Sequence, residues 1–227
     1  MQNPWAELSG DSPCVLPTDR DAVDRVNDRF SLQPDFQVQS QLLPEPFIGA
    51  PTAAVYLLGL NPGYSPADDE WHKNTRFRHA IENCLNHKPA DLPFYFLDPQ
   101  FVEAPGAIWW KQRTRWLKNE VELTTLAQNL FRVELFPYHS RRYKPIPKVI
   151  SQNQLVPSSQ YSVHLVRQAI AAQKTIVAMR SFKKWCQLLP QLSTYPKLVR
   201  LNSPQNVSLS PKNLPGFPLV IRDLQQR

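Results

Sequence analysis

The chain has 227 residues, 42% of them hydrophobic and 20% charged, which suffices for one sizeable core but not for two. Its 26 Lys and Arg residues outnumber 19 Asp and Glu residues, and the net charge of +7 favours an anionic partner, with nucleic acid as the first candidate. No stretch approaches the ~20 apolar residues of a membrane span, and the first residues lack the pattern of a signal peptide. We therefore expect a cytoplasmic protein with no membrane partner, although many soluble proteins carry such a charge without binding a polyanion.

The cysteines give no sign of a metal centre. Cys14, Cys84 and Cys186 are odd in number and far apart, which argues against structural zinc, an iron–sulfur cluster or a disulfide framework. The acidic run 68–70 offers an alternative metal site, but carboxylates at the start of a helix also match the helix dipole. The sequence therefore predicts no metal and no cofactor.

Residues 1–50 are expected to form a helix and an arm that pack on a single domain formed by residues 51–227. Thr18 is typical of a helix start, with Asp21 in the capping-box position. Residues 31–50 contain Pro34, Pro44 and Pro46, which forbid a continuous helix. This arm is predicted to be extended and to lie across the surface.

The remaining chain alternates between strand and helix patterns. Continuous apolar runs predict buried parallel strands at 53–60, 131–136, 175–179 and 198–201. Helical spacing predicts crossovers at 74–87, 108–130, 159–172 and 181–189. The order predicts an α/β fold, a three-layer α/β/α sandwich with a short central parallel sheet. The oligomeric state is not defined by the sequence, and a monomer is the simplest expectation.

The loop after the first predicted strand is the most informative segment. Parallel sheets bind ligands outside the carboxyl ends of their strands, and this loop reads Gly59-Leu60-Asn61-Pro62-Gly63. Its two glycines let backbone amides approach a ligand closely, and the carboxamide of Asn61 can orient a water molecule. Alternatively, the segment is a turn in which Asn61 bonds its own backbone.

This loop resembles the first motif of the uracil-DNA glycosylase superfamily. It is similar to the Gly-Ile-Asn-Pro-Gly motif of the mismatch-specific and thymine-DNA glycosylase branch, with Leu60 in place of isoleucine. The resemblance implies a uracil-DNA glycosylase-like fold and a hydrolase of N-glycosidic bonds that acts on DNA in base excision repair. Asn61 would position the water that attacks C1′ of a flipped nucleotide, and the backbone of 59–63 would contact the extruded base.

The second motif of the superfamily is divergent in this chain. Where the family has a form like His-Pro-Ser-Pro, the sequence reads Leu201-Asn202-Ser203-Pro204-Gln205-Asn206. The resemblance implies that Ser203, Pro204, Gln205 and Asn206 contact DNA, but Leu201 stands where the family has a histidine that stabilises the departing base. His139 is the candidate to supply this imidazole from another loop, or else a structural hydrogen-bonding residue.

Three further residues are candidates for the base pocket. Many family members read uracil with an asparagine where this chain has Glu134, so the base need not be uracil: a neutral Glu134 donates a hydrogen bond, and an ionised one accepts from an amino-bearing base. The alternative is that Glu134 pairs with Arg132. Tyr64 and Phe77 are candidate stacking platforms, with Phe77 alternatively a core residue.

Two basic segments bear on nucleic-acid binding. Arg141, Arg142 and Lys144 follow a predicted strand and are candidates for phosphate contacts. In the segment 109–118 the tryptophans are predicted to face the core and the cations the solvent. Three hypotheses stay open: a DNA N-glycosylase, a noncatalytic nucleic-acid-binding module on the same fold, and an enzyme acting on free nucleosides or nucleotides.

Overall fold

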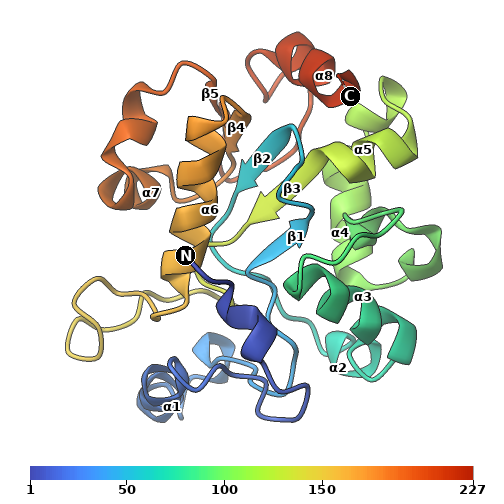
Figure 1. Cartoon of the computed structure of the whole chain (residues 1–227). Coiled ribbons are helices and arrows are strands. Elements are labelled where there is room, and N and C mark those ends of the chain that lie inside the picture. Colours follow the sequence, from blue (N-terminus) through green and yellow to red (C-terminus); the bar gives the residue numbers. More distant parts are fainter. Residues whose placement is uncertain (227) are drawn as a thin grey trace.

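A five-stranded, mostly parallel sheet forms the centre of the protein. The computed structural model describes residues 1–226. The strands are β1 (Phe47–Gly49), β2 (Val55–Leu58), β3 (Leu130–Val133), β4 (Thr175–Ala178) and β5 (Leu198–Arg200), in the spatial order β1-β3-β2-β4-β5. Strands β2 to β5 pair in parallel, and β1 is antiparallel to β3 (Figure 1). The four predicted parallel strands are all present.

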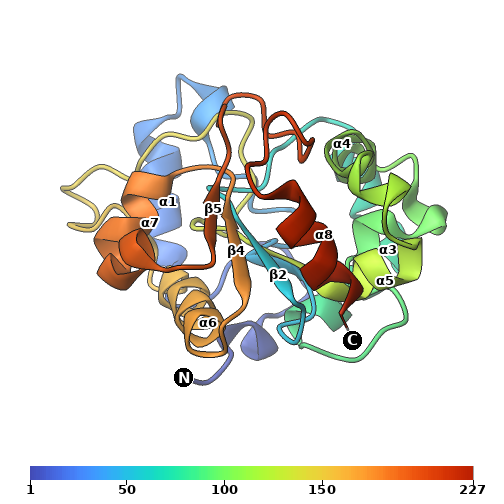
Figure 2. The same ribbon diagram turned by 90° about the horizontal axis from the view of Figure 1, so that it is seen from above.

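Helices cover both faces of this sheet. They are α1 (Arg20–Arg29), α2 (Asp68–Trp71), α3 (Thr75–Leu85), α4 (Pro105–Thr114), α5 (Leu123–Asn129), α6 (Ser159–Ala171), α7 (Phe182–Leu188) and α8 (Phe217–Gln225). Short 3-10 turns lie at Pro4–Glu7, Pro34–Phe36, Tyr95–Leu97, Pro99–Phe101, Leu117–Asn119 and Pro190–Thr194. Figure 2 shows α6 and α7 on one side of the sheet and α3, α4, α5 and α8 on the other. The predicted three-layer α/β fold is confirmed.

The central strand β2 fixes where a site can form. All four of its residues are buried, as its continuous apolar run predicts, because helices cover both of its faces. Leu58, its last residue, is in register with Val133 of β3 and Ala178 of β4. The loops after these three strands therefore leave the sheet at the same edge.

The N-terminal arm differs from its prediction. Residues 42–49 are buried, and the arm ends as strand β1 at the edge of the sheet rather than on the surface. Gly49 has φ of +108°, and a Cβ there would lie 2.4 Å from the carbonyl oxygen of Leu130, so only glycine fits this approach of two strands. Tertiary pairing with β3, which local sequence does not reveal, explains the difference.

The predicted helix at 108–130 is also divided. It consists of α4, a 3-10 turn at Leu117–Asn119 and α5. The hydroxyl of Thr114 donates to the carbonyl of Trp110 at 2.8 Å, a side-chain bond that competes with continuation of the helix. As a result Trp116 is 39% exposed, and the expectation that it faces the core is wrong.

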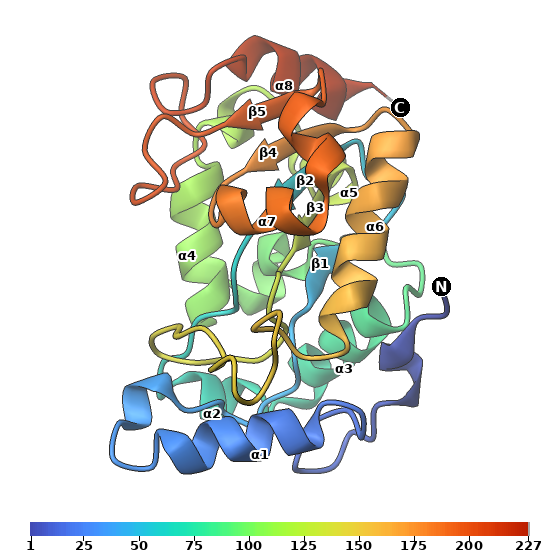
Figure 3. The ribbon, with the colours of Figure 1, turned by 90° about the vertical axis from the view of Figure 1, so that its left-hand side faces the viewer.

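The two ends of the described chain lie on different parts of the molecule. Figure 3 shows α1 at the opposite end of the protein from α8. Helix α8 is the one α-helix in residues 1–226 longer than four residues that the sequence patterns did not predict. Within the same residues, no helix has the length and apolar character needed to cross a membrane.

Candidate functional site

The loop after β2 begins against a buried ion pair. Gly59 is buried, and a Cβ on it would lie 1.9 Å from Nη2 of Arg132 and 2.1 Å from Oε2 of Glu134. The indole Nε1 of Trp185 donates to the carbonyl of Gly59 at 2.8 Å. Glycine at this position therefore allows the loop to pass directly over charged side chains, and Trp185 holds the loop from α7.

The side chain of Asn61 is held in one orientation. Its Nδ2 donates to the carbonyl of Pro62 at 2.8 Å and to Oγ of Ser140 at 3.1 Å. Because a carbonyl only accepts, the contact with Pro62 fixes which end of the amide is nitrogen. The half-buried Asn61 thus keeps Oδ1 as an acceptor that has no hydrogen-bond donor among residues 1–226.

The loop after β3, residues 134–142, lies alongside the loop after β2, residues 59–63; we call them the second loop and the first loop. The N–H of Phe136 donates to the carbonyl of Leu60 at 2.7 Å, and a parallel bridge joins Gly63 and Ser140. The pairing of β2 with β3 therefore continues past the strands into their loops. Asn61 therefore contacts the 137–142 turn through Ser140.

His139 lies in this turn but faces the interior. It is 3% exposed, and its Nδ1–H donates to the carbonyl of Gly63 at 2.6 Å. The other nitrogen, Nε2, is buried, with Oε1 of Glu45 at 4.0 Å. Burial lowers the pKa of His139 despite the bond to Gly63, so the ring is neutral. The geometry does not support His139 as a group that touches a substrate; it positions the first loop.

Glu134 forms the ion pair that the sequence left as an alternative. Nε of Arg132 donates to Oε1 of Glu134 at 2.7 Å, and both side chains are less than a tenth exposed. The guanidinium also contacts Sδ of Met179 at 3.1 Å and lies over the ring of Trp110. Oε2 of Glu134 is buried, on the side that faces Gly59, and has no hydrogen-bond partner among residues 1–226.

The two candidate stacking rings differ in position. Tyr64 is half-buried and its hydroxyl donates to Oδ2 of Asp69 at 2.7 Å, so it stays near the surface beside the first loop. Phe77 is 2% exposed and packs against Trp71, Tyr95 and Phe101. The structure corrects the prediction for Phe77, which is a core residue because its helix turns this face inward.

The loop after β5 is organised by a residue that sequence patterns missed. The side chain of Asn213 accepts from the N–H of Ser203 and donates to the carbonyls of Ser203, Asn206 and Ser208. Pro204, Gln205 and Asn206 are exposed at its tip, and Leu201 is buried. Among the described residues, Ser203 makes hydrogen bonds only inside this loop.

The basic segment at 141–144, which the sequence offered for phosphate contacts, is partly neutralised. Arg141 and Arg142 both lie 3.5 Å from the carboxylate of Asp35, and Lys144 lies over the rings of Phe30 and Phe36. Two positive charges thus share one negative charge, which reduces the field available for a phosphate.

A second basic group lacks such neutralisation. The N–H of Arg180 donates to the carbonyl of Leu58, so Arg180 follows β4 at the same edge of the sheet as Asn61. Burial, and then the nearby Arg180, lower the pKa of Arg113 at the end of α4. In the part of the chain that the structure describes, neither arginine forms an ion pair. The carbonyl of Arg113 accepts from the N–H of Leu209, which joins α4 to the loop after β5.

One group of side chains has the composition of a metal site. Atoms of Glu45, His72 and His139 that can ligate a metal all lie within 4.8 Å of one another, and all three residues are buried. The predicted acidic alternative at 68–70 is used otherwise: Asp68 accepts from the N–H of Ser65, and Glu70 pairs with Lys73. Glu45 and His72 were not foreseen, because single residues at irregular spacing carry no sequence signal.

No protein-family model, curated protein or solved structure matches the chain. A functional assignment therefore depends on the chemistry of the residues themselves.

Proposed function

We propose that the protein is a DNA N-glycosylase that hydrolyses the bond between a flipped base and its sugar. The observation that carries this proposal is the fixed amide of Asn61, whose two hydrogens are bound to Pro62 and Ser140 and whose Oδ1 is free to accept. This amide lies at the carboxyl end of the central strand, where α/β sheets bind their ligands.

Asn61 would act by orienting water rather than by removing a proton. An amide oxygen is a weak base, but it can hold one hydrogen of a water molecule so that a lone pair points at C1′. N-glycosidic cleavage passes through an oxocarbenium-like transition state, which needs a well-placed nucleophile and negative charge nearby more than a strong base.

The groups near the base suggest how it is recognised. Position 201 is a leucine, which has no imidazole, and His139 faces inward, so neither residue donates to the leaving base. Within residues 1–226 the Oε2 of Glu134 is an acceptor without a partner, but it is buried beneath Gly59, so a base would reach it only when the first loop moves. An acceptor at this place favours a base that carries an amino group over uracil.

The surroundings of Asn61 suit a charged polymer better than a free nucleoside. Arg180 follows β4 at the same edge of the sheet as Asn61, Arg113 lies near Arg180, and neither forms an ion pair within residues 1–226. Two cations without carboxylate partners at this edge match a chain of phosphates. The exposed tip at 204–206 adds a loop that can reach the same strand.

Replacing Asn61 tests the chemistry. We expect the unchanged protein to produce alkali-labile sites in at least one of a set of end-labelled oligonucleotides, single- and double-stranded, with amino-bearing and keto bases. Asn61→Ala should lower this rate by about a hundredfold or more, the usual effect of losing a group aimed at the transition state. Asn119→Ala, at an exposed asparagine of a 3-10 turn, is the matched control and should be fully active.

Two results would contradict the proposal. The first is an unchanged protein that leaves every oligonucleotide intact, and the second is an Asn61→Ala protein as active as the control. If the first result is accompanied by salt-dependent DNA binding, the protein is the noncatalytic binding module.

The proposal also specifies which arginines should contact phosphate. We expect the double change Arg113→Gln/Arg180→Gln to weaken DNA binding and to reduce the slope of log K against log salt by about 1.5, the value for two lost phosphate contacts. Arg141→Gln/Arg142→Gln should have about half this effect, because Asp35 already offsets one of the two charges. Binding to one labelled oligonucleotide at four salt concentrations measures both slopes. Equal slopes, or a larger effect of the second pair, would refute this assignment.

A further inference from the structure

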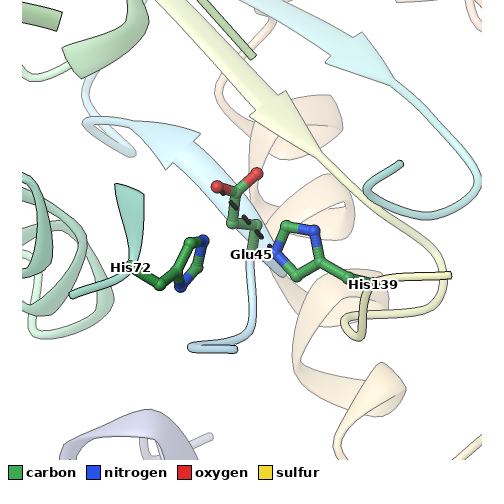
Figure 4. Close-up of side chains that lie close together, drawn as sticks. All are labelled: Glu45, His72 and His139. Carbon is green, nitrogen blue, oxygen red and sulfur yellow. Dashed lines mark ion pairs between the residues drawn. The ribbon is translucent and has the colours of Figure 1, made fainter. Parts of the chain in front are cut away.

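Three buried side chains from distant parts of the sequence point toward one another. Glu45 belongs to the arm before β1, His72 follows α2, and His139 follows β3 (Figure 4). Each is at most 5% exposed. The rings of His72 and His139 are perpendicular, with centroids 5.4 Å apart, and Oε1 of Glu45 lies 4.0 Å from Nε2 of His139.

We propose that Glu45, His72 and His139 bind one divalent cation of the zinc class as a structural metal site. Three atoms within 4.8 Å of one another leave a central point no more than about 2.8 Å from each. Because zinc bonds to imidazole nitrogen and carboxylate oxygen are about 2.0–2.2 Å, shifts of under 1 Å bring these three ligands to bonding distance, and a water molecule would take the fourth tetrahedral position.

The state of His139 suits a metal ligand. Its Nδ1–H donates to the carbonyl of Gly63, so Nε2 carries a lone pair, and in the described part of the chain this buried nitrogen has no hydrogen-bond partner. A histidine that binds a metal through one nitrogen commonly donates the hydrogen on its other nitrogen to a backbone carbonyl. Two imidazoles and one carboxylate favour zinc and its first-row neighbours over Mg²⁺ or Ca²⁺, which prefer oxygen ligands.

The charges around the site also favour a cation. Burial, and then the nearby Asp68 carboxylate, raise the pKa of Glu45 to about 8, and burial lowers the pKa of His72 to about 2. The buried hydroxyl of Tyr95 lies beside Glu45. A divalent cation would offset the clustered carboxylates and restore the ionised form of Glu45.

One contact must change when the metal binds. Nδ1 of His72 now accepts from the N–H of Leu43 at 3.0 Å, so the proton of this neutral ring is on Nε2. Figure 4 shows a ring nitrogen of His72 directed at Glu45. Coordination through Nε2 moves the proton to Nδ1 and breaks the bond to Leu43. A structural metal ion stabilises a fold far more than one such hydrogen bond does.

The site would join the arm, α2 and the second loop, and through His139 it would hold the carbonyl of Gly63 in the first loop. This role is independent of the proposed glycosylase reaction, because a metal bound there stabilises the same loop whatever the loop binds.

Zinc binding to the full chain tests the proposal without any DNA. The purified protein, freed of metal with a chelator and dialysed, should take up one Zn²⁺ per chain in calorimetric titration. Its melting temperature should rise with Zn²⁺ and not with Mg²⁺. Zn²⁺ should also shift the amide resonance of Leu43 and remove its protection from hydrogen exchange, which binding to surface histidines would not do.

Glu45→Gln is the decisive variant, because it keeps the size and shape of this buried side chain and removes only the carboxylate. It should fold and bind Zn²⁺ more than about 100-fold more weakly, beyond the 10–100-fold cost of an altered outer-shell group. His79→Gln, at an exposed histidine on α3, should bind Zn²⁺ normally. Absence of equimolar binding by the folded unchanged chain, or equal affinity in Glu45→Gln, would overturn the proposal.

Discussion

Changing Gly59 to alanine is expected to destabilise the protein by about 3–5 kcal/mol, the range for a disrupted buried ion pair. The new methyl group would lie 1.9 Å from Nη2 of Arg132 and 2.1 Å from Oε2 of Glu134, well inside contact distance. Neither side chain can move outward, because both are less than a tenth exposed and packed under the loop. The loop must therefore shift or the ion pair must separate, and either change displaces Asn61.

Gly63→Ala in the same loop is the matched control. A Cβ at Gly63 meets no atom within 4 Å, so this protein should have nearly the stability of the unchanged chain. Urea denaturation followed by tryptophan fluorescence gives both free energies of unfolding. Equal stability of the two variants would show that the ion pair does not lie against Gly59.

The sequence predicted those parts of the site that follow from local pattern. The buried run of β2 ends in turn residues, which placed Asn61 at a sheet edge, and the short spacing of Arg132 and Glu134 on one strand made their pairing a stated alternative. Both features involve residues that are neighbours along the chain. Hydrophobic periodicity and turn residues also reflect interactions between residues that are close in sequence, so they can predict features of this kind.

Contacts between distant segments were not predictable in this way. The carboxylate of Asp19 accepts from the hydroxyl of Tyr138, 119 residues away, and so joins the N-terminal region to the second loop. Likewise, Glu45 meets His139 only because the arm ends as an edge strand beside β3. A single polar residue has no periodicity, so its partner becomes visible only when the sheet order is known.

The pair Arg132 and Glu134 yields the second large prediction. Arg132→Met should lower the free energy of unfolding by about 3–5 kcal/mol, because it leaves Glu134 as a buried carboxylate without its cation. The backbone N–H of Glu134 donates to the carbonyl of Pro46, but this hydrogen bond does not stabilise the side-chain carboxylate. Loss of the contact with the ring of Trp110 adds to the effect.

The double variant Arg132→Met/Glu134→Leu separates charge from packing. Replacement of both partners by apolar side chains of similar size removes the uncompensated charge, so most of the lost stability should return. The two variants are expected to differ also in DNA cleavage: the double variant regains its fold but lacks the Oε2 acceptor proposed to bind the base. A double variant as unstable as Arg132→Met would show that packing around Trp110 and Met179, rather than the charge of Glu134, sets the cost.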